Sequence, residues 1–169
     1  AVMFRFTFPE NEHSYVVVDA LDKGSYIKVI PAENTIIGFT TKNSDGVPQN
    51  FKNYFIIKFD KPFTYKATFD GGTLTQDVDE LTADHSGAVI GFSTHKGEIV
   101  HAKSASSFIS FEQAALNMEE LGDDSFDQLV AKGKAAWNKV LSRIEVEGGT
   151  LDQYRTFYSC MYRSLLFPR

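Results

Sequence analysis

The chain has 169 residues, enough for one ordinary domain with an appendage, and its 43% hydrophobic residues, with 15 phenylalanines, suffice for a core. Its net charge of -5 and pI near 5.3 argue against nucleic acid or an anionic membrane as a partner. No apolar run is long enough to predict a membrane span.

Residues 2–106 show the period-two alternation of short β-strands separated by turn residues. No helical pattern interrupts them, which favours an antiparallel β-sandwich. The side chains expected to be mostly buried are Phe4, Phe6, Phe8, Phe55, Phe59 and Phe69. The nine expected strands are residues 2–8, 15–20, 26–30, 35–41, 54–59, 63–69, 73–76, 88–92 and 98–106.

Turn residues predict several of the connections between these strands. The sequence D-G-G at residues 70–72 indicates a hairpin, and Gly38 suggests a bulge within its strand. Residues 77–85 are interpreted as a loose acidic loop. We expect residues 88–92 to pair with residues 98–106 across the turn at 95–97.

From Ser110 onward the period changes to that of a helix. Three segments share one design, a hydroxyl residue followed by an apolar residue, an acid and a glutamine; they begin at Ser110, Ser125 and Thr150. Each hydroxyl is a helix N-cap, and each acid lies at the positive end of the helix. We expect helices at 111–121, 126–143 and 151–166, and a short strand at 144–147.

The last helix has an apolar face too broad for a lone surface helix. This face contains Leu151, Tyr154, Tyr158, Met161, Leu165 and Leu166. We expect part of it to pack on Trp137 and Leu141, and the remainder to be covered by helices from outside the chain. Cys160 lies near this face and is interpreted as a buried, inert thiol rather than a nucleophile, because no base partner is identifiable.

Polar side chains offer two weak candidates for a metal site. The acidic residues Asp77, Asp79, Glu80 and Asp84 lack the third oxygen residue and the glycine of an EF-hand loop, so we interpret them as a solvated loop. The four histidines, His13, His85, His95 and His101, lack the spacing of zinc ligands.

Aromatic residues are candidate sugar contacts, and the arginines of the last helix are candidate partners for a carboxylate from outside the chain. Aromatic rings stack on pyranoses, but most phenylalanines fall at inward-facing positions, and Trp137 lies on a helical apolar stripe, so core packing is favoured. Arg155, Arg163 and Arg169 lie in or after the last helix. Arg163 is interpreted as a surface arginine, with pairing to a carboxylate from beyond residue 169 as the alternative.

Several spaced features together resemble one enzyme family. They are Trp137-Asn138, the I-E-V-E-G-G run at 144–149, Phe157-Tyr158, Leu165 and Pro168-Arg169, with F-T-F-P at 6–9 and D-K-P-F at 60–63. With these features the chain resembles glycoside hydrolase family 92, the calcium-dependent exo-α-mannosidases. The resemblance covers the N-terminal β-sandwich and only the start of the helical catalytic domain.

The resemblance implies a galactose-mutarotase-like supersandwich followed by linker helices and the first helix of an (α/α)6 barrel. Residues 1–109 would be the sandwich, incomplete at its N-terminus, residues 110–149 a helical linker with the short strand, and residues 150–169 the first helix of a truncated catalytic domain. We therefore expect the chain to be part of a longer protein.

The resemblance also implies an inverting exo-α-1,2-mannosidase, in which a glutamic acid protonates the leaving oxygen and an aspartate activates water. A calcium ion holds the mannose hydroxyls. Family members carry these residues after the point where this chain ends, so no catalytic or metal-binding residue is assigned here, and the substrate-binding residues stay unknown. The parent is expected to bind calcium and mannose-containing glycans, in the periplasm or outside the cell.

Two other classes remain open from the sequence. One is a non-catalytic carbohydrate-binding sandwich, and the other is a structural domain that docks other proteins. The helix after Thr150 discriminates between them and the hydrolase, because a self-contained module would not end in a broad uncovered apolar face.

Overall fold

The computed structural model describes residues 1–166. The chain separates into two compact units, Ala1–Asp123 and Asp124–Arg169, and each is described by itself. The first is the expected β-sandwich followed by a helix, and the second is helical.

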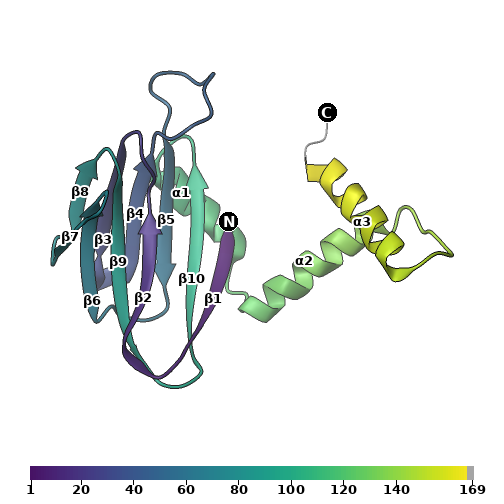
Figure 1. Cartoon of the computed structure of the whole chain (residues 1–169), viewed down its shortest axis with the longest axis horizontal. Coiled ribbons are helices and arrows are strands. Elements are labelled where there is room, and N and C mark those ends of the chain that lie inside the picture. The colour runs from purple at the N-terminus through teal and green to yellow at the C-terminus, as the bar shows by residue number, and fades with distance from the viewer. Residues whose placement is uncertain (167–169) are drawn as a thin grey trace. The chain divides into compact units, whose positions relative to one another are not determined.

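Two antiparallel sheets face each other in the first unit (Figure 1). The six-stranded sheet, called sheet A, has the order β1-β10-β5-β4-β3-β8, and the four-stranded sheet B has the order β2-β9-β6-β7. The strands are β1 (Val2–Phe8), β2 (Asn11–Asp19), β3 (Ser25–Ile30), β4 (Thr35–Thr40), β5 (Asn53–Phe59), β6 (Tyr65–Asp70), β7 (Thr73–Gln76), β8 (Glu80–Ala83), β9 (Ser86–Thr94) and β10 (Glu98–Ser107).

The core lies between the two sheets and follows the period-two pattern of the sequence. Sheet A contributes Ile27, Val29, Ile36, Phe59, Val100 and Ala102, and sheet B contributes Val18, Ala88, Ile90 and Phe92. Alternate residues of each strand face this layer because successive side chains point to opposite faces of a sheet. The predicted antiparallel sandwich is therefore confirmed.

Two expectations about the strands were wrong. Residues 80–83, expected to lie within a loop, form the edge strand β8 that pairs with β3. Strands β9 and β10 do not pair with each other: β9 lies between β2 and β6, and β10 between β1 and β5. The turn at 95–97 therefore connects a strand of sheet B to a strand of sheet A. In the sequence this connection looks like a hairpin, because apolar and polar residues alternate along both strands in either case.

Two of the six phenylalanines expected in the core lie elsewhere. Phe59 is buried, and Phe6, Phe8 and Phe55 are half-buried. Phe4 is 45% exposed because it lies on the edge strand β1, at the outer end of a row of rings that runs through Phe6 and Phe8. Phe69 is half-buried but faces away from the core, where its ring lies against Gly87.

Gly38 was expected to mark a bulge, and this was also wrong. Strand β4 pairs in unbroken register with both β3 and β5 through Gly38. The space beside Gly38 is filled by the ring of Phe55 and the backbone carbonyl of Tyr26. The glycine therefore permits close packing, and the sandwich's irregularity lies in β2, between Asn11 and Ser14.

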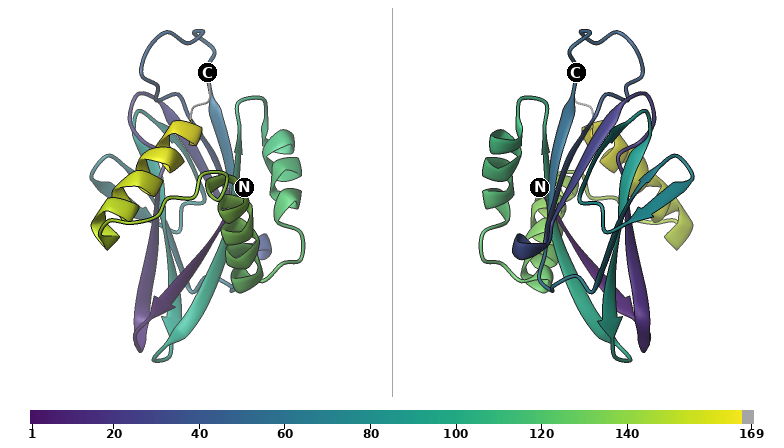
Figure 2. Two further views of the ribbon diagram at one scale, coloured as in Figure 1. Left: turned by 90° about the vertical axis from the view of Figure 1, so that its right-hand side faces the viewer. Right: turned by 90° about the vertical axis from the view of Figure 1, so that its left-hand side faces the viewer.

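Helix α1 (Phe111–Met118) covers the outer face of sheet A, on the side away from sheet B (Figure 2). Phe111 packs edge-on against Tyr54, with ring centroids 5.0 Å apart, and Ala114 is fully buried. A 3-10 turn (Glu119–Leu121) follows and ends at Gly122, as expected, where φ is 52°. One face of the sandwich is thus covered by the chain's own helix.

The second unit contains helices α2 (Phe126–Leu141) and α3 (Leu151–Leu166). The repeated cap design is confirmed: the Ser110, Ser125 and Thr150 hydroxyls accept hydrogen bonds from the backbone N–H of Gln113, Gln128 and Gln153, respectively. The expected strand at 144–147 is absent from the described structure. The described residues of the second unit contain no strand with which this segment could pair.

Replacing Ser125 with alanine is expected to destabilise α2 by about 1 kcal/mol. The Ser125 side chain accepts from the Gln128 backbone, and the Gln128 side chain accepts from the Ser125 N–H at 2.8 Å, so the substitution removes one half of a reciprocal cap. Thermal unfolding of the full-length polypeptide measures the effect, with Ser125→Thr as the control that keeps the hydroxyl. An unchanged melting temperature for Ser125→Ala would contradict the cap.

Candidate functional site: polar networks and the helical junction

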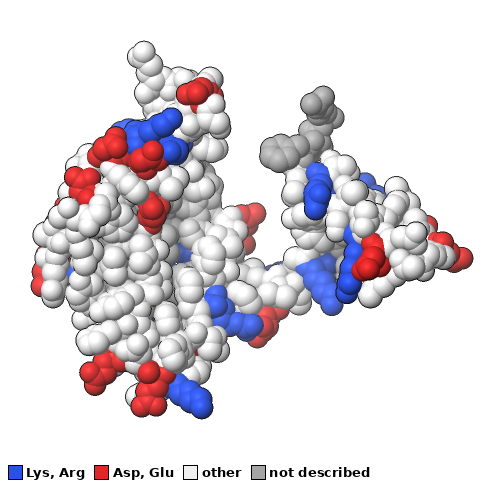
Figure 3. All heavy atoms as spheres, in the orientation of Figure 1, with Lys and Arg blue, Asp and Glu red and all other residues white. Residues whose placement is uncertain are grey.

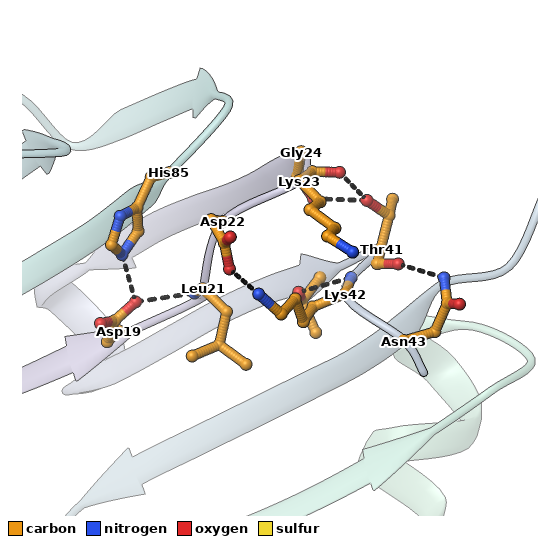
Figure 4. A network of polar contacts seen from close by, with 10 residues as sticks. Asp19, Leu21, Asp22, Lys23, Gly24, Thr41, Lys42, Asn43 and His85 are labelled. Atoms are coloured by element: carbon orange, nitrogen blue, oxygen red, sulfur yellow. Dashed lines mark hydrogen bonds and ion pairs between the residues drawn. The ribbon is translucent and has the colours of Figure 1, made fainter. Parts of the chain in front are cut away.

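A network of polar contacts joins three connections at one end of the sandwich (Figure 4). Asp19, at the end of β2, accepts from the backbone N–H of Leu21 at 2.7 Å and contacts Nε2 of His85 at 2.9 Å. Thr41, just after β4, donates to the carbonyl of Gly24 and also contacts that of Lys23. The β2–β3 turn is therefore attached on both sides.

This turn has an unusual backbone. Leu21 and Lys23 have φ values of 67° and 70°, in the left-handed region that side chains other than glycine rarely adopt. Such conformations persist only where surrounding contacts enforce them. Here the enforcing contacts are backbone bonds from Ala20 to Ser86 and from Gly24 to Asp84, together with the ion pair between Asp22 and Lys42. The network thus holds a turn in place.

Four carboxyl groups have a pKa below the ordinary value, which favours their ionised form. The Lys42 ammonium lowers the pKa of Asp22, Lys28 that of Glu80, and Lys61 that of Glu98. A hydrogen bond from Ser110 lowers the pKa of Glu112. A general acid for glycoside hydrolysis needs a raised pKa, so none of these four is suited to that role.

The acidic residues interpreted as a solvated loop are distributed over separate ion pairs. Asp79 pairs with Lys66, and Glu80 pairs with Lys28 at 2.9 Å and accepts from the Tyr26 hydroxyl at 2.9 Å. Asp77 and Asp84 are exposed. The side chains therefore do not converge on a common point.

The histidines likewise lie apart. His85 contacts Asp19, and Nδ1 of His101 lies 2.9 Å from a carboxylate oxygen of Asp60. His13 stacks on Tyr15, and His95 lies at the sheet-crossing turn. Among residues 1–166, no group of three or more His, Cys, Asp or Glu side chains is placed to hold a metal ion. The donors described here do not fit calcium, which needs six to eight oxygens.

Tyr26 makes the stability of the sandwich depend on pH in the alkaline range. Burial, followed by its hydrogen bond to Glu80, raises its pKa from 10.0 to about 12. Because the folded pKa lies above the unfolded one, the neutral hydroxyl stabilises the fold fully below pH 10, and this contribution is lost as the pH rises through 12. The stability advantage of the wild type over Tyr26→Phe is expected to shrink across this interval. Urea unfolding at pH 9 and pH 11.5 measures it, and a constant difference would contradict the assignment.

Helices α2 and α3 contact each other through aromatic side chains. The rings of Trp137 and Tyr162 meet edge-on with centroids 4.5 Å apart, and the Tyr158 hydroxyl donates to the carbonyl of Ile144 at 3.2 Å. Trp137 is half-buried rather than a core residue. The expected contact of α3 with Trp137 is thus confirmed, but Tyr162 makes it rather than a residue named in the predicted face.

Within the second unit, the apolar face of α3 is only partly covered. None of its residues is buried, and Leu151 is 64% exposed. Cys160 is exposed, so the expectation of a buried thiol was wrong; it lies beside the apolar face rather than within it. Arg155 pairs with Asp152 at 3.2 Å and Arg163 lies on the surface, whereas Arg169 is outside the described residues.

The described residues thus combine an antiparallel β-sandwich followed by a helix with a second unit of two helices, α2 and α3. The model of the glycosyl hydrolase family 92 N-terminal domain matches residues 1–107, and that of the family 92 catalytic domain matches residues 113–169. The chain belongs to glycoside hydrolase family 92.

Solved structures of this family are similar to the chain. A family 92 inverting mannosidase from Bacteroides thetaiotaomicron is 45% identical over 99% of the chain, with a TM-score of 0.91. A family 92 α-mannosidase from the same organism, in complex with mannoimidazole, is 26% identical over 87% of the chain, with a TM-score of 0.72. Another family 92 glycosyl hydrolase is 26% identical over 95% of the chain, with a TM-score of 0.78.

The chain spans 23%, 21% and 22% of the lengths of these three proteins. A comparison with curated proteins gave no match. Among residues 1–166, none of the helices has the length and apolar character needed to cross a lipid bilayer.

Proposed function

We propose that this chain is the N-terminal part of an inverting, calcium-dependent exo-α-1,2-mannosidase that acts on mannose-containing glycans. The observation that carries the proposal is the 45% identity, over 99% of the chain, to an inverting mannosidase of the family. The match of residues 113–169 to the family's catalytic domain supports a hydrolase over a binding module.

In this proposal the reacting carboxyls belong to the remainder of the polypeptide. Inversion requires two carboxyls about 6.5–9.5 Å apart, one protonating the leaving oxygen while the other activates a water molecule on the opposite face of the sugar. Of the four carboxylates with lowered pKa in this chain, Asp22, Glu80 and Glu98 pair with lysines, and Glu112 is hydrogen-bonded by Ser110. The calcium ligands are likewise proposed to lie outside residues 1–166.

The described residues would support the fold of the enzyme rather than react with the substrate. The sandwich supplies a folded body, and the exposed side chains of α3, including Leu151 and Leu166, offer an apolar face to further helices of the same polypeptide. Burying each such side chain contributes about 1.5–3 kcal/mol. We also propose a periplasmic or extracellular location, on family resemblance alone.

The proposal is tested with the full-length polypeptide and with residues 1–169 alone. The full-length polypeptide is expected to hydrolyse an α-1,2-mannobiose with inversion, which NMR detects as the anomer first released, and chelation of calcium should abolish turnover. Residues 1–169 are expected to be inactive with or without calcium. Turnover by residues 1–169, or retention of configuration by the full-length polypeptide, would refute the proposed mechanism.

A further inference from the structure

The outer face of sheet B carries aromatic and apolar side chains that no helix of the first unit covers. Helix α1 covers sheet A, on the opposite side of the sandwich (Figure 2). By strand register, Tyr15 and Val17 of β2 share this outer face with Tyr65 of β6, and Tyr15 and Val17 are 46% and 61% exposed. The two tyrosines therefore lie on either side of β9 on one face of the sheet.

A glycine between the two tyrosines controls how their rings lie. Tyr15 and Tyr65 are both direct cross-strand partners of Gly91, which lies between them on β9. A Cβ atom at Gly91 would lie 2.7 Å from Cβ of Tyr65 and 3.0 Å from Cε1 of Tyr15. The absence of a side chain therefore lets the Tyr15 ring lean across the sheet, which leaves part of it facing solvent.

The two tyrosine rings meet edge-on, with centroids 5.3 Å apart and planes at 67°. The His13 ring lies nearly parallel to that of Tyr15, with centroids 6.3 Å apart. Ser93, two residues after Gly91 on the same face of β9, is exposed. Within residues 1–166, no protein group hydrogen-bonds the hydroxyls of Tyr15, Tyr65 or Ser93. The rings are thus bordered by polar groups available to a ligand.

This face is also nearly free of charge. Figure 3 views it directly, and the Lys, Arg, Asp and Glu side chains gather mostly at the ends and edge of the strands rather than over the middle of the sheet. With a chain net charge of -5, this argues against a phosphate-bearing ligand. An uncharged ligand with an apolar face and a hydroxyl rim matches the surface best.

We propose that Tyr15 and Tyr65, with His13 and Ser93 beside them, form a binding surface for a neutral pyranose chain. Pyranose C–H groups carry slight positive charge and pack on the electron-rich face of an aromatic ring. The sugar hydroxyls can then exchange hydrogen bonds with the tyrosine, serine and imidazole groups. The identity of the sugar as mannose rests on the proposed function.

The test uses the full-length polypeptide and soluble α-mannan as the probe, with mannoimidazole present to saturate the substrate site. Affinity electrophoresis is expected to show about tenfold weaker binding of mannan by Tyr15→Ala, since an aromatic contact of this kind is worth roughly a factor of ten. Leu74→Ala is the matched control, because Leu74 is 51% exposed and lies on β7 of the same sheet. Both variants should hydrolyse an aryl α-mannoside as the wild type does.

A second measurement needs no variant. Nitration of Tyr15 in the wild type, followed by mass spectrometry of its peptide, is expected to slow when mannan is added. Undiminished binding by Tyr15→Ala, absence of mannan binding by the wild type, or a Tyr15 that resists nitration without mannan would each overturn the surface. Tyr15-dependent mannan binding by a protein that lacks mannosidase activity would uphold the surface and refute only the proposed function.

Discussion

Replacing Phe92 with alanine is expected to lower the free energy of unfolding of the sandwich by about 3–5 kcal/mol. Phe92 is only 2% exposed, and its ring lies 6.1 Å from that of Phe8, 5.8 Å from that of Phe59 and 5.9 Å from that of Phe63, centroid to centroid. These three rings come from different segments of the chain. All of them would line the cavity left by the substitution.

The cavity is not expected to close, because β9 is held on both sides by β2 and β6. The cost therefore includes the unfilled space as well as the lost burial. Calorimetry of the full-length polypeptide measures the effect as a lower transition temperature for the sandwich. Val17→Ala is the control, since its side chain is 61% exposed and should shift stability by under about 0.5 kcal/mol. Equal shifts for the two variants would contradict the described core.

The second large effect is expected at Gly38, where alanine should cost about 1–3 kcal/mol. The added Cβ would lie 2.5 Å from the backbone carbonyl oxygen of Tyr26 and would also meet the ring of Phe55. The ring has room to turn only at the expense of its packing, and the carbonyl belongs to β3, which is paired with β4. Relief therefore requires a shift of the strand itself.

Gly72→Ala is the matched control for Gly38→Ala. Gly72 lies in the β6–β7 turn, and a Cβ there would meet no atom within 4 Å. Chemical denaturation of both variants in the full-length polypeptide compares the two sites. If Gly38→Ala is as stable as Gly72→Ala, the close approach of β3 to β4 at this glycine is not as described.

The elements with local signals were predicted well from the sequence. The three helices begin where the hydroxyl caps place them, because a cap depends only on residues within four positions of each other. The D-G-G hairpin at 70–72 joins β6 to β7 as expected, with Asp70 opposite Thr73.

The errors concern interactions between distant segments. An alternating strand pair separated by a short turn fits both a hairpin within one sheet and a passage between two sheets, so the sequence could not place β9 and β10. Strand β8 was missed because only Leu81 packs on the core, and its remaining contacts are the backbone pairs with β3. The placement of β9 and β10 and the formation of β8 both depend on strands that are remote in the sequence.

The sugar-binding surface was missed for a related reason. The strand that contains Tyr15 continues with three valines, so both of its faces carry apolar residues. The sequence therefore does not show which face of this strand is exposed. The relation of Tyr15 to Tyr65 exists only through Gly91, and that register follows from pairing across three strands. A glycine in mid-strand was the one local signal, because glycine in a strand often marks a close approach.

The pairing of β1 has a consequence for how this protein is made. Among residues 1–166, its strand neighbour is β10, with Val2 opposite Ser104 and Phe8 opposite Glu98. During synthesis this pairing can form only after β10 has followed β1 out of the ribosome. Contacts this remote in sequence form slowly, and an apolar strand that waits is prone to aggregate. The pairing of β1 with β10 should thus be among the slower steps in the folding of the sandwich.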